Sequence, residues 1–203
     1  MSHRTLSSIA HEAARIICEE SLTDYHVAKL KAAQRLGLGV KTALPKNADV
    51  EAAVLEYQRL FGGPQYSERL HKLRRTAVRA MKLLAAFDPR LVGAAVSGAV
   101  GDAHRVQLHV FGEKPELLDA FFHDRGIRYE QGEREYRYPD GSTELIPLLR
   151  FEADDVGVDV ASFALGEERR LPLSPADGDP MRRLTLADAE ALLHTPGAAL
   201  SVS

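Results

Sequence analysis

The chain has 203 residues, with 26 Lys plus Arg against 29 Asp plus Glu and a formal net charge of −3. This length suits one full domain, or a small helical module attached to an α+β domain with a sizeable core. The near balance of charge excludes the overall positive charge of a dedicated nucleic-acid-binding protein and leaves room only for a local basic patch.

The single cysteine and the absence of long apolar runs indicate the cellular compartment of the protein. Cys18 has no partner for an internal disulfide and lies in an apolar helical stretch, which favours a buried thiol in a reducing compartment. No apolar run approaches the roughly 20 residues needed to span a bilayer, and the first residues carry Glu12, Glu19 and Glu20 instead of a signal-peptide core. We therefore expect a cytoplasmic protein without a membrane segment.

The first 88 residues predict a helical module. Apolar side chains recur at helical spacing in four segments, which are bounded by capping residues or by glycine and proline. The predicted helices cover about residues 6–20, 23–37, 47–61 and 65–86.

The fourth predicted helix carries the one concentration of positive charge in the chain. Beside its apolar stripe stand six basic residues, namely Arg69, Lys72, Arg74, Arg75, Arg79 and Lys82. Two interpretations stay open. The charges form a solvated face that pairs with acids such as Glu51 and Glu56, or they form a ridge that faces phosphates or RNA, with Arg75 and Arg79 binding the nucleotide.

The stretch from Leu91 to Phe111 predicts a strand, a turn and a second strand. Two apolar runs, residues 91–96 and 106–111, flank a connection that contains Gly98 and Gly101. A glycine-bearing loop between two core strands is a common place to hold a phosphate, and it is also how an ordinary hairpin turns.

The remainder predicts a short helix that begins after Pro115 and ends at Gly126, and then strands in hairpin succession. Pro147 indicates that its strand lies at an edge or carries a bulge. Thr185, with Asp188 three residues on, is expected to cap a last helix. The predicted strands cover residues 127–130, 133–138, 145–151 and 156–163.

This order of elements predicts an α+β fold. We expect an N-terminal helical module in residues 1–88, a mixed β-sheet flanked by helices in residues 89–194, and a flexible tail in residues 195–203.

The stretch VSGAVGDAHRVQLHV, from Val96 to Val110, resembles the signature of the nucleotidyltransferase superfamily with the polymerase-beta type fold. In that family a strand ends in a Gly-Ser loop, the next strand carries an Asp-x-Asp pair, and a later strand supplies a third carboxylate. The resemblance extends to about Val160 and includes the segment from Lys114 to Tyr129. It implies a nucleotidyltransferase-like sheet that would bind a nucleotide and Mg²⁺.

Carried over residue by residue, the resemblance implies nucleotide-binding roles for Ser97, Gly98 and Gly101. The two carboxylate positions fall on Gln107 and His109, and the third falls on Asp159. Mg²⁺ prefers anionic oxygen ligands, so glutamine and histidine are a poor substitute.

Other readings of these residues stay open. Gln107 and His109 either line an altered pocket that still binds the nucleotide or form the solvent face of a half-buried strand. Asp102 is a second candidate catalytic acid beside Asp159. A transition-metal site made of His104, His109 and Asp159 is a further alternative, because imidazole suits such metals.

The sequence leaves open whether the protein is an enzyme. We expect a degenerate nucleotidyltransferase-like protein that binds a nucleotide, RNA or a protein. One alternative is an active transferase that uses Asp159 and Asp102, with Mg²⁺ and a nucleotide, to modify RNA, a protein or a small molecule. The other is an interaction protein with an apolar patch on its N-terminal helices.

Overall fold

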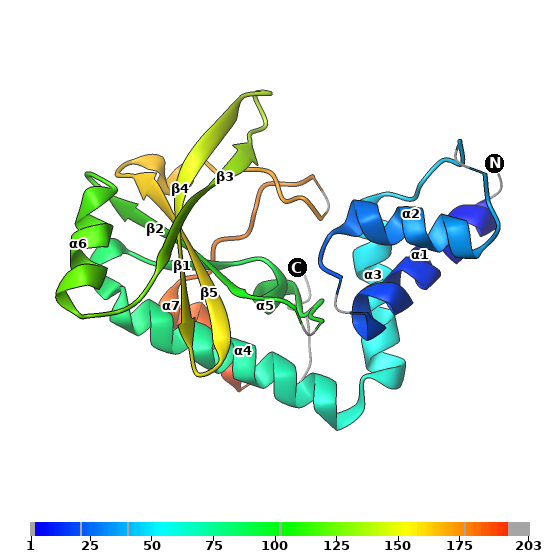
Figure 1. Ribbon diagram of the computed structural model, residues 1–203, viewed down its shortest axis with the longest axis horizontal. Helices are drawn as coiled ribbons and strands as arrows, with labels where there is room; N and C mark the ends of the chain where they lie inside the picture. The colour runs from blue at the N-terminus through cyan, green and yellow to red at the C-terminus, as the bar shows by residue number, and fades with distance from the viewer. Residues whose placement is uncertain (1–2, 21, 40, 102, 177, 195–203) are drawn as a thin grey trace. The chain divides into compact units, whose positions relative to one another are not determined.

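The computed structural model describes residues 3–20, 22–39, 41–101, 103–176 and 178–194. Within these residues the chain forms seven α-helices and one five-stranded mixed sheet, and the helical region precedes the sheet in sequence (Figure 1). The predicted α+β class is confirmed. The expected tail, residues 195–203, lies outside the described residues, and none of the described helices is long and apolar enough to cross a bilayer.

The chain divides into two compact units, which we call unit 1 and unit 2. Unit 1 contains residues 1–69, 98–104 and 175–178, and unit 2 contains residues 70–97, 105–174 and 179–203. The sequence-based division after residue 88 falls inside unit 2.

Unit 1 contains three helices around an aliphatic core: α1 (His3–Glu19), α2 (Tyr25–Arg35) and α3 (Asn47–Phe61). Asp24 caps α2, because its side chain accepts hydrogen bonds from the amides of His26 and Val27. The core has the apolar periodicity that predicted these helices, and it includes Ile9, Ala13, Ile16, Ile17, Ala28, Ala32, Val50 and Val54.

The basic helix is α4 (Gly63–Leu83), and its residues from Leu70 onward belong to unit 2. Arg74, which was predicted on the charged surface, is buried instead. Its Nε donates to the carbonyl of Ala95 at 3.0 Å, and its Nη1 donates to the carbonyl of Leu192 at 3.4 Å. Arg74 therefore joins α4 to two other segments of unit 2, and its charge does not contribute to a surface ridge.

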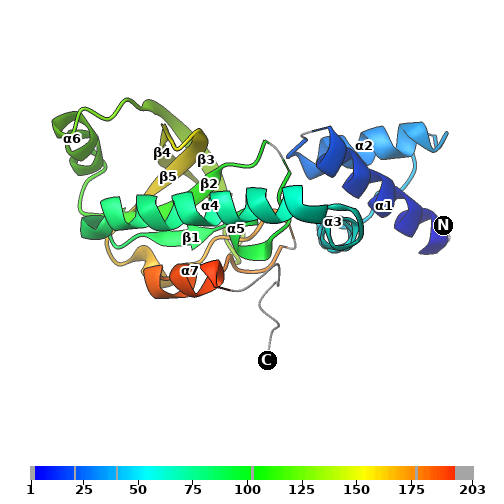
Figure 2. The same ribbon diagram turned by 90° about the horizontal axis from the view of Figure 1, so that it is seen from below.

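The sheet belongs to unit 2 and has the strand order β1-β2-β5-β4-β3. β2 and β5 are parallel, and the other neighbouring pairs are antiparallel. Figures 1 and 2 both draw α4 alongside these strands. The strands are β1 (Arg90–Val92), β2 (Val106–Gly112), β3 (Glu130–Arg137), β4 (Thr143–Ala153) and β5 (Val156–Ala164).

Two strand predictions were wrong. The apolar run 91–96 ends as a strand at Val92, and α5 (Ala94–Ser97) follows after Gly93. A short apolar run fits a helix or a strand equally well, and only the three-residue pairing of β1 with β2 decides between them. Residues 127–130 form no separate strand, because β3 begins at Glu130, so three strands follow β2 instead of four.

The expectation that Pro147 marks an edge strand or a bulge is wrong for β4. β4 as a whole lies between β3 and β5, but its described pairs with β5 begin only at Leu148. Pro147 itself pairs with Glu133 of β3. The proline thus lies where β4 has a paired neighbour on one side, which is where a missing N–H breaks no ladder.

Each face of the sheet has its own cover. On one face, Phe122 of α6 (Glu116–Asp124) packs against Phe151, and their ring centroids are 5.1 Å apart. The last helix, α7 (Leu186–Leu193), begins with the predicted capping box of Thr185 and Asp188. On the opposite face lies a cluster of Val92, Phe111, Tyr136, Tyr138, Ile146, Leu148, Ala161, Phe163 and Met181.

Candidate functional site

The sheet brings together the three residues that fall at the carboxylate positions of the resemblance. Gln107 and His109 are two residues apart on β2, so their side chains share one face. Asp159 is the direct partner of Gln107 on the parallel strand β5. The three side chains therefore start from neighbouring positions on the face opposite to Phe151.

Asp159 is bound by two arginines. Nε of Arg105 donates to Oδ1 of Asp159 at 2.6 Å, and Nη2 of Arg134 donates to Oδ2 at 2.6 Å. The Asp159 side chain is only 5% exposed, whereas the side chains of Arg105 and Arg134 are 36% and 30% exposed. Both oxygens of this acid are thus engaged by guanidinium groups that themselves reach solvent.

Two glycines make room for arginine side chains on this face. A Cβ at Gly157 of β5 would collide with the guanidinium of Arg105, and a Cβ at Gly132 of β3 would lie 3.3 Å from Nη1 of Arg150. Arg150 is half-buried and is the register partner of Asp159 on β4. Glycine inside a strand marks such close approaches, and here the approaching groups are cations.

His109 is fully buried, so the interpretation of a solvent-facing strand is wrong for this residue. Its Nδ1 accepts a hydrogen bond of 3.0 Å from Nε of Arg183, and its Nε2 lies 3.2 Å from the hydroxyl of Tyr136. Burial, followed by the charges of Arg183 and Arg134, lowers the pKa of His109 well below 6.5. The ring is therefore neutral at pH 7, with its hydrogen on Nε2.

Gly93 is the glycine that ends the first strand. It has a φ of 73°, and a Cβ there would lie 2.6 Å from Oε1 of Gln107. The strand-ending turn was expected at Ser97 and Gly98, whereas Ser97 lies at the end of α5. The glycine that contacts Gln107, and with it the face of Asp159, is thus one that sequence reasoning missed.

The predicted phosphate loop belongs to unit 1, apart from Ser97. Its carbonyls at Gly98 and Val100 accept hydrogen bonds from Tyr66 and Gln58. The amide of Val100 donates to the carbonyl of Gly98, and that of Gly101 donates to Nδ1 of His104 at 2.7 Å. Burial lowers the pKa of His104, so this ring stays an acceptor at pH 7.

These internal bonds leave the amides of Val100 and Gly101 engaged within the loop, so neither is directed at a ligand. Asp102, the second candidate acid, lies outside the described residues.

Arg75 and Arg79 are exposed on α4. Arg79 donates to Oδ2 of Asp154 in the turn between β4 and β5 at 2.6 Å, and the nearby Lys82 pairs with Glu190 at 2.7 Å. In the described part of the chain, no recorded contact joins Arg75 or Arg79 to Asp159. Arg79 and Lys82 thus make exposed ion pairs, with Asp154 and Glu190 in place of the expected Glu51 and Glu56.

The donor set does not suit a metal ion. Among the described residues, no three His, Cys, Asp or Glu side chains are placed to hold one. Both ring nitrogens of His109 are within reach of protein partners, and the oxygens of Asp159 bind arginines. Within the described residues, these contacts leave neither His109 nor Asp159 free for the transition-metal site that the sequence suggested.

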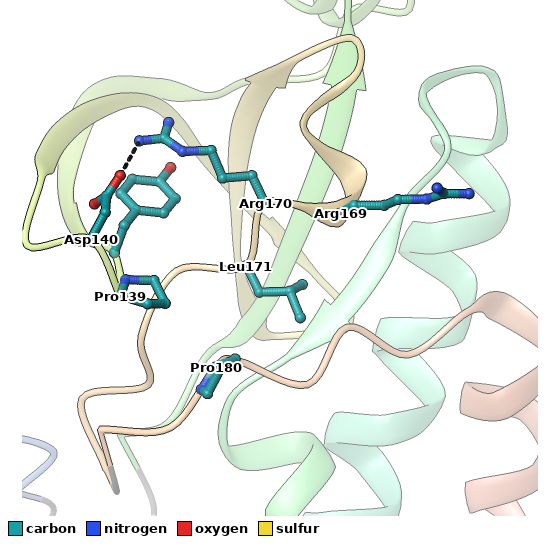
Figure 3. A pocket seen from close by; sticks show the side chains of 7 residues that line it. Pro139, Asp140, Arg169, Arg170, Leu171 and Pro180 are labelled. Carbon is teal, nitrogen blue, oxygen red and sulfur yellow. Dashed lines mark ion pairs between the residues drawn. The ribbon is translucent and has the colours of Figure 1, made fainter.

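A pocket of about 340 Å³ lies elsewhere in unit 2, and none of the predicted site residues lines it (Figure 3). Its charge is largely compensated, because Arg170 pairs with Glu144 at 2.6 Å and Glu167 at 3.2 Å. The Arg170 guanidinium also covers the ring of Tyr138 at 3.7 Å. The pocket is lined by Tyr138, Pro139, Asp140, Arg169, Arg170, Leu171 and Pro180.

No protein-family model matches the chain, and no curated protein matches it significantly. The side chains of unit 2 are therefore the basis for a functional proposal. The residues that sequence reasoning missed there are Gly93, Arg105, Arg134 and Arg150. The signal that marks three of them is the placement of glycine inside or directly after strands, at residues 93, 132 and 157.

Proposed function

We propose that unit 2 is a nucleotidyltransferase-like domain that binds a ligand and does not carry out Mg²⁺-dependent nucleotidyl transfer. The observation that carries this proposal is the pair of 2.6 Å bonds from Arg105 and Arg134 to the two oxygens of Asp159. A metal ion bound by Asp159 would have to share one of these oxygens with a guanidinium group. It would also approach two fixed positive charges, which repel it.

The topology supports the nucleotidyltransferase-like part of the proposal. β1 and β2 are antiparallel, Gly93 ends β1, and β2 runs parallel to β5, where Asp159 lies beside Gln107. This arrangement agrees with what the resemblance implies for a glycine turn, a metal-binding strand and a later strand with a third acid. Fold alone does not determine activity, so the activity is argued from the side chains.

The side chains argue against transfer. Gln107 has no charge, and His109 is neutral and buried, so neither supplies the negative charge that holds Mg²⁺. Asp159 alone cannot build the two-metal arrangement on which such transfer depends. The alternative of an active enzyme would need Asp102, which lies outside the described residues.

A transfer assay tests the proposal. The purified chain is incubated with labelled nucleoside triphosphates, Mg²⁺ or Mn²⁺, and an RNA pool, and label on RNA or on the protein is measured. We expect no transfer above background. Metal-dependent transfer that disappears in Asp159→Asn and persists in Asp154→Asn would overturn the proposal, because both variants remove an acid that binds an arginine of unit 2.

A second candidate, a protein-binding role, is favoured by apolar side chains on unit 1. Val27 and Leu30 lie three residues apart on α2 and are 45% and 47% exposed, and Phe61 at the end of α3 is 69% exposed. Light scattering over a range of concentrations tests it. We expect association that Leu30→Glu abolishes, and a strictly monomeric wild type would remove self-association as the role of this surface.

A further inference from the structure

Two arginines, Arg105 and Arg134, bind one buried carboxylate on this sheet face, and Arg150 starts from the neighbouring position on β4. We call Arg105, Arg134, Arg150 and Asp159 the arginine corner, and we infer that it binds the phosphate group of a small molecule without a metal ion. The corner has three positive charges and one negative charge. This inference rests on the proposed function, because it names the ligand class for the same face of unit 2.

The arginines keep hydrogen-bond donors beyond those that Asp159 uses. Asp159 takes Nε of Arg105 and Nη2 of Arg134. A guanidinium carries five N–H donors, and in the described contacts Arg150 has no ion pair. The side chain of Asp159 is 5% exposed, whereas those of Arg105 and Arg134 are 36% and 30% exposed. The acid therefore lies at the base of the arginine corner, and the two arginines reach solvent.

The glycines fix where two of these cations lie. Gly157 allows the guanidinium of Arg105 to lie directly over β5, and Gly132 allows that of Arg150 to lie close to β3. Arg134 comes from β3 as well and reaches Asp159 on β5. The three arginines therefore come from β3, from β4 and from the residue before β2, and those at positions 105 and 134 meet at Asp159. A cluster that is held in place before binding loses less conformational entropy when the ligand arrives.

Two further acids belong to the surroundings. Glu130 is the cross-strand partner of Arg150, and Glu152 is the partner of Gly157, so both start on the same face. Both are exposed, and within the described contacts neither pairs with the three arginines. They reduce the positive potential at the margin. Nη2 of Arg105 also donates to the carbonyl of Phe151 at 3.4 Å, but Asp159 is the one acid that pairs with the three arginines in the described contacts.

The ligand class follows from charge and shape. A phosphate monoester carries nearly two negative charges at pH 7 and several acceptor oxygens, and the planar fork of arginine binds two such oxygens side by side. The net charge of +2 at the corner matches this dianion. A divalent cation is not needed as a bridge, because the arginines already occupy the carboxylate that would hold it.

Calorimetric titration of the full chain in EDTA tests this inference. The probes are inorganic phosphate, pyrophosphate and ATP, with adenosine as the probe that lacks phosphate. We expect the phosphate-bearing probes to bind and adenosine not to bind. If free phosphate binds as well as ATP, the ligand is recognised by its phosphate alone, and if ATP binds better, the site also contacts the nucleoside. Both results support the inference.

Variants locate the binding. Arg150→Gln, which breaks no recorded ion pair, and Gly157→Ala, which displaces Arg105, should each weaken binding about tenfold, the loss expected for a charged hydrogen bond. Arg137→Gln is the matched control, because Arg137 lies on the same strand as Arg134, points to the other face and is 77% exposed. Its affinity should equal that of the wild type.

Two results would overturn the inference. The first is equal affinity in all three variants, and the second is the absence of binding by every phosphate-bearing probe in EDTA. Neither result affects the proposed function, which the transfer assay tests separately. If binding appears only with Mg²⁺ and transfer is observed, both proposals fail together.

Discussion

Nε of Arg183 donates a hydrogen bond of 3.0 Å to Nδ1 of the fully buried His109. This bond needs an unprotonated Nδ1, so a proton on His109 would remove the acceptor and place a buried cation beside the half-buried Arg183. Arg134 adds a third positive charge nearby, and Tyr136 at Nε2 carries none at neutral pH. The neutral ring is therefore a condition of the native packing.

The first prediction concerns stability at mildly acidic pH. Because the pKa of His109 is lowered in the folded protein, the unfolded chain takes up the proton first as the pH falls below 6.5. Above pH 6.5 the neutral His109 makes its full contribution to the free energy of unfolding. Below this pH the free energy of unfolding decreases by up to about 1.4 kcal/mol for each pH unit, until the pH reaches the pKa of His109 in the folded protein. Urea unfolding at about pH 7.5 and about pH 5.5 measures the loss.

His104 contributes in the same direction, so variants are needed to isolate His109. His109→Gln, which has no titrating ring, should flatten the pH dependence of the unfolding free energy, although its absolute stability is lower. His71→Gln, at an exposed position of α4, should leave the slope as in the wild type. If the unfolding free energy depends on pH with the same slope in the wild type and both variants, the pH dependence does not come from His109.

The second prediction concerns Asp159. Asp159→Asn removes the charge that compensates two guanidinium groups, and we expect it to lower the free energy of unfolding by about 1 to 3 kcal/mol. This is less than for a fully buried pair, because both arginines reach solvent. Asp154→Asn breaks the pair with Arg79, which is 65% exposed, and should cost less than about 1 kcal/mol. Chemical denaturation of both variants makes the comparison.

The third prediction separates backbone strain from steric collision at Gly93. Gly93→Ala combines a φ of 73° with a Cβ placed 2.6 Å from Gln107 Oε1, whereas Gly126→Ala has a φ of 63° and open space. We expect about 1 to 2 kcal/mol of destabilisation at Gly126 and clearly more at Gly93. Adding Gln107→Ala should recover part of the loss at Gly93 but none at Gly126. Equal costs would show that the contact with Gln107 is unimportant.

The fourth prediction concerns the single thiol. Burial raises the pKa of Cys18 from 9.0 to about 11, so the folded protein at about pH 8 contains about 100-fold less thiolate than the unfolded chain. Alkylation of the native protein should be slower by about this factor, and urea should restore the ordinary rate. Rapid alkylation of the native protein would place Cys18 at an accessible, reactive position.

Features that depend on neighbouring residues were predictable from sequence. The capping box of Thr185 and Asp188 is an example, because both residues belong to one helical turn and satisfy each other. The resemblance also grouped Asp159 with Gln107 and His109 as the three carboxylate positions, and in the sheet Asp159 is the register partner of Gln107. In both cases the information lay in the local pattern or in a family-like spacing.

Features that depend on tertiary packing were not predictable. The end of β1 at Val92 reflects a three-residue pairing with β2, which an apolar run does not encode. The arginine corner joins Arg105, Arg134 and Arg150, which are far apart in sequence and look like ordinary surface residues within their own strands. Only the intervening Gly132 and Gly157 hinted that something approaches the sheet closely.

The bonds that Arg105 and Arg134 make with Asp159 also affect protein engineering. Aspartates at positions 107 and 109 would supply the two acids that the resemblance expects there. An acid at position 107, however, would lie beside the guanidinium groups of Arg105 and Arg134 and could pair with them. Such a variant would gain internal ion pairs before it gained a metal ion. A designed metal centre on this face requires that Arg105 and Arg134 be replaced as well. It therefore needs at least four substitutions at once, at positions 105, 107, 109 and 134.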